Sequence, residues 1–430
     1  MEILTWFVRF CLAPCLFMVA VSSAVAQDTS AENEFDPESL CPAELGNPPE
    51  PAIAITGQFE DTGAEWLFCI PDPELGLFNG MLVVYAHGTV NVTQQAGSLE
   101  AISDQVKVGD LDIPRVLNSL GFAFGVVARS KTGLSVPEGI DETKRLVELF
   151  RDTVAPPALV YVIGVSQGGS IATLLNEVDQ NDGFAGALSV CSTHGKFRAQ
   201  FRYFLDFAVL FDYFFRKPLR EEGISLLQKR DDKPYVPQRV IDNWETGENL
   251  KDVITGLIAE PEHADALSQA LNCAGVPSDA SGEMTQVEIA EELIEQSFLG
   301  INDGVETVGG NPAGNLNRLY FCSDNPLRLN LGVKRFRTSA WAVSMLNANY
   351  ETTGQLNTPL VALHNLQDHR VPFWHEVIYW LKTLRGQSAE FYTVVPASGF
   401  GHCEPTVEEA LDAFGLLIQK STGLGLTQSE

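Results

Sequence analysis

The feature that most constrains the fold of this chain is a serine flanked by glycines, placed between two apolar segments. Residues 158–163 are apolar and rich in β-branched side chains, and they lead directly into the pattern Gly-x-Ser-x-Gly at residues 164–168. Residues 170–175, which follow, are again mostly apolar. A strand, a sharp turn and a helix in this order force the serine into a strained conformation, and the glycines let strand and helix approach closely. We therefore expect the Ser166 hydroxyl to project from the end of a strand, beside helix N-terminal amides.

Apolar strands and amphipathic helices alternate on both sides of this turn. Such an alternation indicates an α/β fold, with a mostly parallel sheet that helices cover on both faces. A hairpin is expected before it, within residues 53–77, where Gly57, Gly63 and Pro71 separate short apolar pieces. The expected strands are residues 81–86, 122–128, 159–165, 184–191, 359–368 and 390–396, and the expected helices lie near residues 113–120, 140–153, 166–179 and 406–419.

A long interval, residues 194–355, interrupts the alternation with helical patterns and few strand signals. Because it is too long for a plain loop, we predict a helical cap inserted into a core made of residues 53–193 and 356–430. Residues 27–52 are acidic and contain prolines, and we expect an exposed N-terminal arm there.

The first 26 residues have the pattern of a secretory signal peptide. Arg9 precedes an apolar run at residues 10–21, and the small residues at 24–26 resemble a cleavage site. Lipid attachment at Cys15 is the alternative, but the apolar stretch before that cysteine would be very short. We therefore predict a secreted or periplasmic protein.

The interval opens with a helix unusually rich in aromatic residues. Their spacing of three and four residues places them on one face, with further aromatic residues on a second face. This pattern is typical of a buried helix that fixes the cap to the core. The alternative is that part of the face, including Phe197 and Phe201, lines an apolar substrate pocket. The first face comprises Phe197, Phe201, Phe204, Ala208, Phe211 and Phe215, and the second comprises Tyr203, Phe207, Leu210 and Phe214.

The net charge of −28 argues against nucleic acid as a partner, because an acidic surface repels phosphates and anionic lipid headgroups. Beyond the signal segment, no apolar stretch is long enough to predict a membrane span.

Six cysteines lie beyond the signal segment, and an even number in an exported chain favours disulfides over metal. No Cys-x-x-Cys or paired-histidine spacing argues for zinc, so neither a metal nor a cofactor is expected. Proximity in the sequence favours Cys41 with Cys69 and Cys273 with Cys322. Cys191 and Cys403 then remain as a third pair, the alternative being that either is a buried thiol.

Two further residues complete a nucleophilic site around Ser166, since a serine hydroxyl needs a base and a carboxylate that orients it. Asp368 closes the strand at residues 359–368, and His402 follows the strand at 390–396. In a parallel sheet both positions lie at the edge where Ser166 is expected. The order Ser, Asp, His along the chain fits a catalytic triad built at the carboxyl ends of successive strands. Glu376 and Asp324 are the alternative acids.

Backbone amides that stabilise an oxyanion are expected next to this serine and after an early strand. Gln167 directly follows Ser166, and Thr89 follows Gly88 in the loop after the strand at residues 81–86. Gly88 and His194 are further candidates for contact with a substrate, although packing is the simpler role for His194. We expect His87 and His364 to bond backbone near the site, and His369 and His375 to lie on the surface.

The chain resembles the α/β-hydrolase superfamily over residues 53–418, and is similar in particular to secreted bacterial esterase-like members. The resemblance rests on His87 and Gly88, the turn at residues 164–168, Asp368 followed by Val371 and Pro372, and His402 beside Cys403. It implies an eight-stranded, mostly parallel sheet and an acyl-enzyme mechanism, but it does not fix the substrate.

One departure from related enzymes concerns the cysteines. Tannase and feruloyl esterase relatives join a cysteine beside the nucleophile to one beside the histidine. Here Val165 precedes Ser166, so that bridge cannot form, and Cys191 at the end of the next strand is the available partner for Cys403.

These observations predict a serine hydrolase that cleaves small or polymeric carboxylic esters. A serine exopeptidase is the first alternative, and acidic side chains of the cap that grip a substrate amine would distinguish it. A catalytically silent binding protein on the same scaffold is the second alternative, and an intact triad argues against it.

Overall fold

The computed structural model describes residues 35–42, 52–108, 111–178, 183–279, 282 and 284–423. The expected signal peptide and most of the expected arm lie outside the described residues. Of the arm, a short 3₁₀ helix, Pro37–Leu40, is described, and the disulfide Cys41–Cys69 attaches it to the sheet.

Eight strands form one sheet, in the order β1-β2-β6-β3-β7-β8-β11-β12. β2 pairs antiparallel with both β1 and β6, and all the other neighbours are parallel. This is the strand order of the α/β-hydrolase fold, so the expected fold class is confirmed. The strands are β1 (Ile53–Gln58), β2 (Glu65–Ile70), β3 (Met81–Ala86), β6 (Ala123–Val127), β7 (Leu159–Val165), β8 (Phe184–Val190), β11 (Leu360–Gln367) and β12 (Tyr392–Phe400).

The register of the parallel strands brings their carboxyl ends to one edge of the sheet. Ala86 of β3 pairs with Gly164 of β7, and Val165 pairs with Val190 of β8. Val190 in turn pairs with Leu363 of β11. The loops that follow these four strands therefore begin close together and carry Thr89, Ser166, His194 and Asp368, while His402 follows the neighbouring strand β12.

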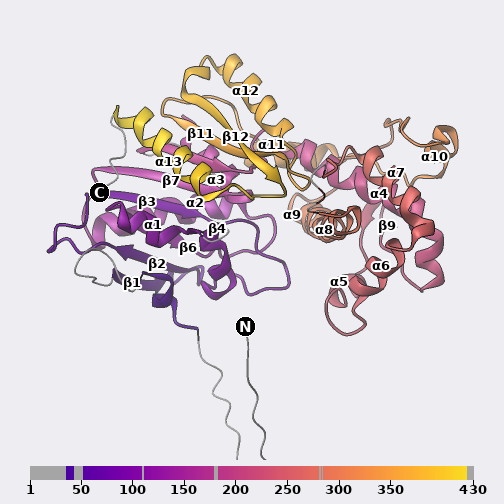
Figure 1. Cartoon of the computed structure of the whole chain (residues 1–430), viewed down its shortest axis with the longest axis horizontal. Coiled ribbons are helices and arrows are strands. Elements are labelled where there is room, and N and C mark those ends of the chain that lie inside the picture. Colours follow the sequence, from indigo (N-terminus) through magenta and orange to yellow (C-terminus); the bar gives the residue numbers. More distant parts are fainter. Residues whose placement is uncertain are drawn as a thin grey trace, which may run out of the picture. The chain divides into compact units, whose positions relative to one another are not determined.

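Helices cover the sheet at the four places where the sequence predicts them, and a fifth, at residues 374–386, was not predicted (Figure 1). The apolar side chains of α2, including Ile140, Leu146 and Phe150, are buried in the core. α13 begins with a complete capping box, in which Thr406 and Glu409 satisfy each other's backbone amides. The helices are α1 (Ile113–Ser119), α2 (Val136–Thr153), α3 (Gln167–Asn176), α12 (Trp374–Gly386) and α13 (Val407–Thr422), and a small ladder joins β4 (Lys107–Val108) to β5 (Leu111–Asp112).

The segment between β8 and β11 is mainly helical, and it is drawn from magenta to orange in Figure 1. It has apolar clusters of its own, yet Phe197 near its start and Leu346 and Tyr350 near its end join the core of the sheet. The division at residues 194 and 355 stays a prediction. The segment contains α4 (Phe197–Glu221), β9 (Gln228–Arg230), β10 (Lys233–Tyr235), α5 (Gln238–Asp242), α6 (Leu250–Ile258), α7 (Ala264–Ala274), α8 (Gln286–Phe298), α9 (Gly304–Thr307), α10 (Pro326–Gly332) and α11 (Ala340–Asn349).

The aromatic helix α4 serves the core of this inserted segment along most of its length. Phe207, Phe211 and Phe215 are buried, and the rings of Phe211 and Phe215 stack with centroids 4.6 Å apart. Each buried ring contributes about 1.5–3 kcal/mol to folding. None of the helices in the described part of the chain is both long and apolar enough to cross a bilayer.

Candidate active site

Ser166 lies at the turn between β7 and α3 with φ 56° and ψ −120°. Two glycines make this conformation possible. A Cβ atom on Gly168 would lie 1.9 Å from the carbonyl oxygen of Ala86, and one on Gly164 would lie 2.0 Å from the carbonyl oxygen of Gly168. Any larger residue would push the strand and helix apart, so the glycines fix the position of the serine.

The structure brings Ser166, His402 and Asp368 together. The Nε2 atom of His402 lies 3.0 Å from the Ser166 hydroxyl oxygen, and its Nδ1 atom lies 2.7 Å from Oδ2 of Asp368. Hydrogen-bond distances on both sides of one imidazole allow it to receive the serine proton while the carboxylate orients it.

Asp368 is completely buried, and its loop holds it in place. Its Oδ1 atom accepts hydrogen bonds from the backbone amides of Arg370 (2.9 Å) and Val371 (2.8 Å). Burial works to raise the pKa of this carboxyl, but nearby His402 and His364 lower it further than burial raises it. The group therefore stays ionised at neutral pH.

A second buried acid, Glu376, stands behind this carboxylate. His364 lies between the two acids, with Nδ1 2.6 Å from Oε1 of Glu376 and Nε2 3.3 Å from Oδ2 of Asp368. Burial lowers the pKa of His364, but its bonds to both acids outweigh burial and raise that pKa to about 10. A protonated His364 thus bridges two carboxylates. Asp368 is the acid that contacts His402, and Glu376 contacts His364 behind it.

His364 bonds the backbone oxygen of Val371, as expected, at 2.7 Å. His194, in contrast, is not a wall of the cavity. It is 1% exposed, and Nε2 lies 3.0 Å from Oε2 of Glu376, while Thr193 before it lines the cavity. Of the two roles considered for His194, packing is the one that the structure shows, because Ser189, Glu376 and Tyr392 hold its ring inside the core.

The expectation of surface positions for His369 and His375 was also wrong, since both are buried. His369 bonds Glu292 of α8 at 2.5 Å, and its ring stacks on that of Phe400, 5.2 Å away. His375 lies 3.0 Å from the side-chain oxygen of Gln200 on α4. Residues of the inserted segment contact both rings and help to bury them. The residues next to His369 and His375 in sequence give no indication of this burial.

The two candidate oxyanion donors, Gln167 and Thr89, are neighbours. The amide of Gln167 is the first of α3 and has no acceptor within the helix. The side chain of Gln167 donates to the Thr89 hydroxyl (2.9 Å) and to the carbonyl of Gly133 (2.9 Å), and accepts from the Ser135 amide (2.7 Å). One side chain therefore fixes the spacing of the two loops beside Ser166.

Arg129, which the sequence analysis missed, anchors the loop that carries Thr89. Its guanidinium donates to the carbonyls of His87 (2.8 Å) and Gly88 and to the hydroxyl of Ser135 (2.8 Å). Burial lowers its pKa to about 10, so it remains charged. In the sequence, the only sign of this role is that Arg129 is a charged residue directly after an apolar strand segment.

His87 is held neutral in the same anchor. Burial, and then the charge of Arg129, put its pKa well below the ordinary value. Its Nε2 atom accepts from the Arg129 amide at 3.2 Å, so Nδ1 carries the proton and donates to the Gly88 carbonyl at 2.9 Å. Gly88 does not line the cavity. It forms the anchored backbone just before Thr89.

A cavity of about 90 Å³ opens above Ser166 and His402. Phe197, Phe201 and Phe204 form an aromatic wall, so the start of α4 lines the cavity while the rest of that helix serves the cap's core. The residues that line the cavity are Thr89, Gly133, Leu134, Ser166, Gln167, Thr193, Phe197, Gln200, Phe201, Phe204, Gln296, Gly300, Asp303, Gly304, Arg370, Val371 and His402.

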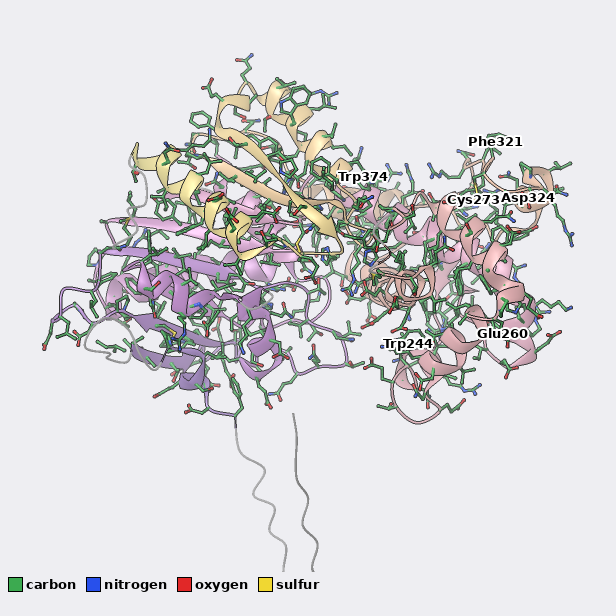
Figure 2. The ribbon with its side chains drawn as sticks, in the orientation of Figure 1. Trp244, Glu260, Cys273, Phe321, Asp324 and Trp374 are labelled. Carbon is green, nitrogen blue, oxygen red and sulfur yellow. A yellow bond between two sulfur atoms is a disulfide. The ribbon has the colours of Figure 1, made fainter. Side chains whose placement is uncertain are left out.

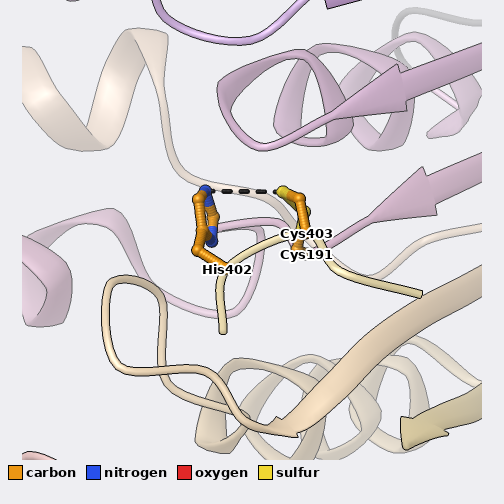
Figure 3. Close-up of side chains that lie close together, drawn as sticks. All are labelled: Cys191, His402 and Cys403. Atoms are coloured by element: carbon orange, nitrogen blue, oxygen red, sulfur yellow. Dashed lines mark hydrogen bonds between the residues drawn. A yellow bond between two sulfur atoms is a disulfide. The ribbon is translucent and has the colours of Figure 1, made fainter. Parts of the chain in front are cut away.

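A disulfide joins Cys403, next to His402, to Cys191 at the end of β8 (Figure 3). Both cysteines have positive φ, 45° for Cys191 and 62° for Cys403. The Sγ atom of Cys403 lies 3.4 Å from Nε2 of His402. These three side chains are close enough to share a metal ion, but sulfurs bonded to each other are not thiolate ligands.

The six cysteines are joined as Cys41–Cys69, Cys191–Cys403 and Cys273–Cys322, the pairs that the sequence favours. A second group that could hold an ion, Glu260, Glu262 and His263, lies near the start of α7, away from the cavity-lining residues.

No family model matches the sequence, and no curated protein matches it. Similar solved structures include the Pyrococcus furiosus esterase Pf2001, at 10% identity over 91% of this chain and 95% of that one, with a TM-score of 0.43. The rice cell wall degrading esterase LipA from Xanthomonas oryzae has 13% identity over 88% of this chain and 87% of that one, with a TM-score of 0.39.

The Pyrococcus horikoshii acylaminoacyl peptidase has 10% identity over 82% of this chain, with a TM-score of 0.39. The chain spans 37% of that peptidase and 42% of a further acylaminoacyl peptidase structure, which is less than half of either. Because these TM-scores are below 0.5, the similar structures carry no argument for a fold or a function. The fold assignment rests on the strand order.

Proposed function

We propose that this chain, which has the α/β-hydrolase fold, is an exported serine hydrolase that cleaves carboxylic esters. The observation that carries the proposal is the continuous bonded series from the Ser166 hydroxyl through His402 to buried Asp368.

In this proposal His402 takes the proton of Ser166 as its oxygen attacks the ester carbonyl. The amides of Gln167 and Thr89 bind the oxyanion of the tetrahedral intermediate, and Asp368 stabilises the imidazolium. His402 then protonates the leaving alcohol, and the acyl group remains on Ser166. A water molecule, deprotonated by His402, then attacks the acyl carbonyl, and His402 returns that proton to the Ser166 oxygen as the acid leaves.

The cavity supports an ester rather than a peptide with a free amino end. Its wall is aromatic, and Asp303 is the only carboxylate among the described residues that line it. Asp303 already accepts hydrogen bonds from the Leu134 amide at Oδ2 and from the Thr307 hydroxyl at Oδ1, so it is a poor partner for an ammonium group. The acidic cluster expected of an exopeptidase is absent from these lining residues.

The test compares a short p-nitrophenyl ester with an aminoacyl p-nitroanilide, using wild type and Ser166→Ala. We expect ester turnover by wild type, and a loss of about 10⁴-fold or more in kcat in the variant with the fold unchanged. A preference for the anilide would favour the peptidase. Failure of wild type to react with a fluorophosphonate probe would favour the silent binding protein.

Export is supported by the three disulfides, since such bonds persist in oxidising compartments. The N-terminal sequence of the protein recovered from its native compartment tests this, and we expect it to begin at Gln27.

A further inference from the structure

The segment at residues 316–341 differs in charge from the rest of the chain. It carries five basic residues and one acidic residue, whereas the whole chain has a net charge of −28. The basic residues are Arg318, Arg328, Lys334, Arg335 and Arg337, and the acidic residue is Asp324.

Four large apolar side chains of this segment are exposed, and we call them the outer patch. They are Leu319 (65% exposed), Phe321 (74%), Leu327 (73%) and Leu331 (80%). Exposed apolar side chains are common singly, whereas contiguous groups of them mark interaction surfaces, and these four lie within 13 consecutive residues. Figure 2 shows Phe321 at the outer edge of the inserted segment.

Several contacts on the inner side hold the outer patch in place. Tyr320 and Leu329 alternate with its members and point inward, where they join a buried cluster with Phe336. The Asn330 side chain accepts from the Tyr320 amide (3.0 Å) and donates to the Tyr320 carbonyl (2.7 Å), which ties the strip 319–321 to α10. The Cys273–Cys322 disulfide, whose Cys273 is labelled in Figure 2, anchors the same strip to α7.

Some cations beside the outer patch are already neutralised, and others are not. Arg318 pairs with Asp206 at 2.5 Å, and Lys334 pairs with Asp212 at 2.8 Å. Arg328 stands between Leu327 and Leu331 in sequence and is exposed, and among the described residues no carboxylate forms an ion pair with it. Arg337 is likewise exposed, without a salt bridge in the described part of the chain.

We infer that the outer patch docks the protein on an anionic lipid surface, with Leu319, Phe321, Leu327 and Leu331 entering the interface and Arg328 contacting the headgroups. Exposed leucine and phenylalanine beside arginine is the composition of interfacial binding elements.

Charge argues for lipid over a second copy of the chain. A symmetric dimer through this face would bring each Arg328 toward the basic residues of its partner. At physiological salt, charges more than about 8 Å from the surface are largely screened, so the local positive charge decides the contact despite the acidic remainder. The acidic surface of the rest of the protein is repelled by the anionic lipid, so the protein binds with the outer patch facing the membrane. The overall charge alone had argued against anionic lipid, and this segment is the local exception.

The test is flotation of residues 27–430 with vesicles of diether phospholipids. These lipids contain no carboxylic ester that the protein could hydrolyse. We expect binding to vesicles of phosphatidylcholine and phosphatidylglycerol in equal parts, weak binding to phosphatidylcholine alone, and a loss of binding at high salt. The triple variant Phe321→Ser, Leu327→Ser, Leu331→Ser should bind at least about tenfold more weakly, and Arg328→Gln about fivefold more weakly.

Leu384→Ser is the matched control, because Leu384 is 47% exposed on α12 outside this segment, and it should bind like wild type. The inference is overturned if the wild type does not bind anionic vesicles, or if the triple variant and the control bind them equally. It is also overturned if the triple substitution instead abolishes self-association seen by sedimentation, which would make the outer patch a dimer interface. None of these outcomes depends on Ser166 or on ester hydrolysis.

Discussion

The edge of the sheet and the inserted segment hold their side chains in different ways. At the edge, two glycines, a buried arginine and a row of buried charges position Ser166, Asp368 and the loop before Thr89. The inserted segment acts from outside: Gln200 and Tyr203 of α4 bond the carbonyls of Arg370 and His369, and Glu292 of α8 bonds their side chains. The catalytic groups are thus held by the sheet and its loops, whereas the inserted segment steadies the loop of Asp368 and forms much of the cavity wall.

The largest effect should follow a change at the sheet edge itself. Asp368→Asn keeps the shape but removes the charge that stabilises the imidazolium and selects its tautomer. We expect kcat/KM for a p-nitrophenyl ester to fall about 10³- to 10⁴-fold, with an unchanged circular dichroism spectrum. A loss below tenfold would mean that another acid, such as Glu376, serves His402.

The buried charges behind Asp368 should appear as a pH dependence of stability. Interactions with His194 and His364 outweigh burial and lower the pKa of Glu376 below its ordinary value of 4.5, so its contribution is present above that pH and is lost as pH falls. The contribution of His364 is present below pH 6.5 and is lost as pH rises through about 10.

Glu376→Gln should therefore lower the free energy of unfolding by about 3 kcal/mol near pH 6, because it leaves two buried histidines without their acid. Its stability should then fall less than that of wild type on acidification below pH 4.5 and on alkalinisation toward pH 10. Denaturant titrations across this range measure the effect. Parallel curves for both proteins would show that Glu376 is not charged in the folded state.

Two disulfides allow the regions to be compared directly. Replacing Cys191 and Cys403 by Ala should lower kcat about tenfold, because the loop of His402 loses its link to β8. Replacing Cys273 and Cys322 by Ala should leave ester turnover within about twofold, since that bond lies in the inserted segment. Equal losses of kcat in the two double variants, both folded by calorimetry, would contradict the division of labour between the regions.

The smallest effect is expected at the contact between the regions. Glu292→Gln weakens the bonds to His369 and Arg370, in which the neighbouring charges lower the pKa of Glu292 to about 2 despite its burial. We expect a two- to fivefold loss of kcat/KM and about 1 kcal/mol less stability. Glu288→Gln, on the same helix and bonded only to Thr285, is the control. A loss of kcat/KM as large as that of Asp368→Asn would show that the inserted segment contributes directly to catalysis.

Local patterns predicted the parts of the site that depend on neighbouring residues. The turn at Ser166, the strand ends before Asp368 and His402, and the alternation of strands and helices all follow from short-range sequence, because burial and backbone geometry are set within a few residues. The fold class could therefore be stated before the structure.

Contacts between distant segments could not be predicted in the same way. His369 is polar and follows an aspartate in a loop, yet Glu292 and Phe400, far away in sequence, bury it. Arg129 and Glu376 likewise owe their roles to carbonyls and histidines that only the folded sheet brings near. The sequence offered only the place of Arg129 after an apolar strand and Glu376 as an alternative acid, and neither predicted the contacts that these residues make.

Peptide mapping after reaction with a fluorophosphonate tests most directly whether these three side chains act as one site. We expect a single adduct on Ser166 in wild type, and labelling at least about 100-fold slower in folded His402→Ala, since the serine then lacks its base. An adduct on any other residue, or labelling of His402→Ala at the wild-type rate, would contradict the account.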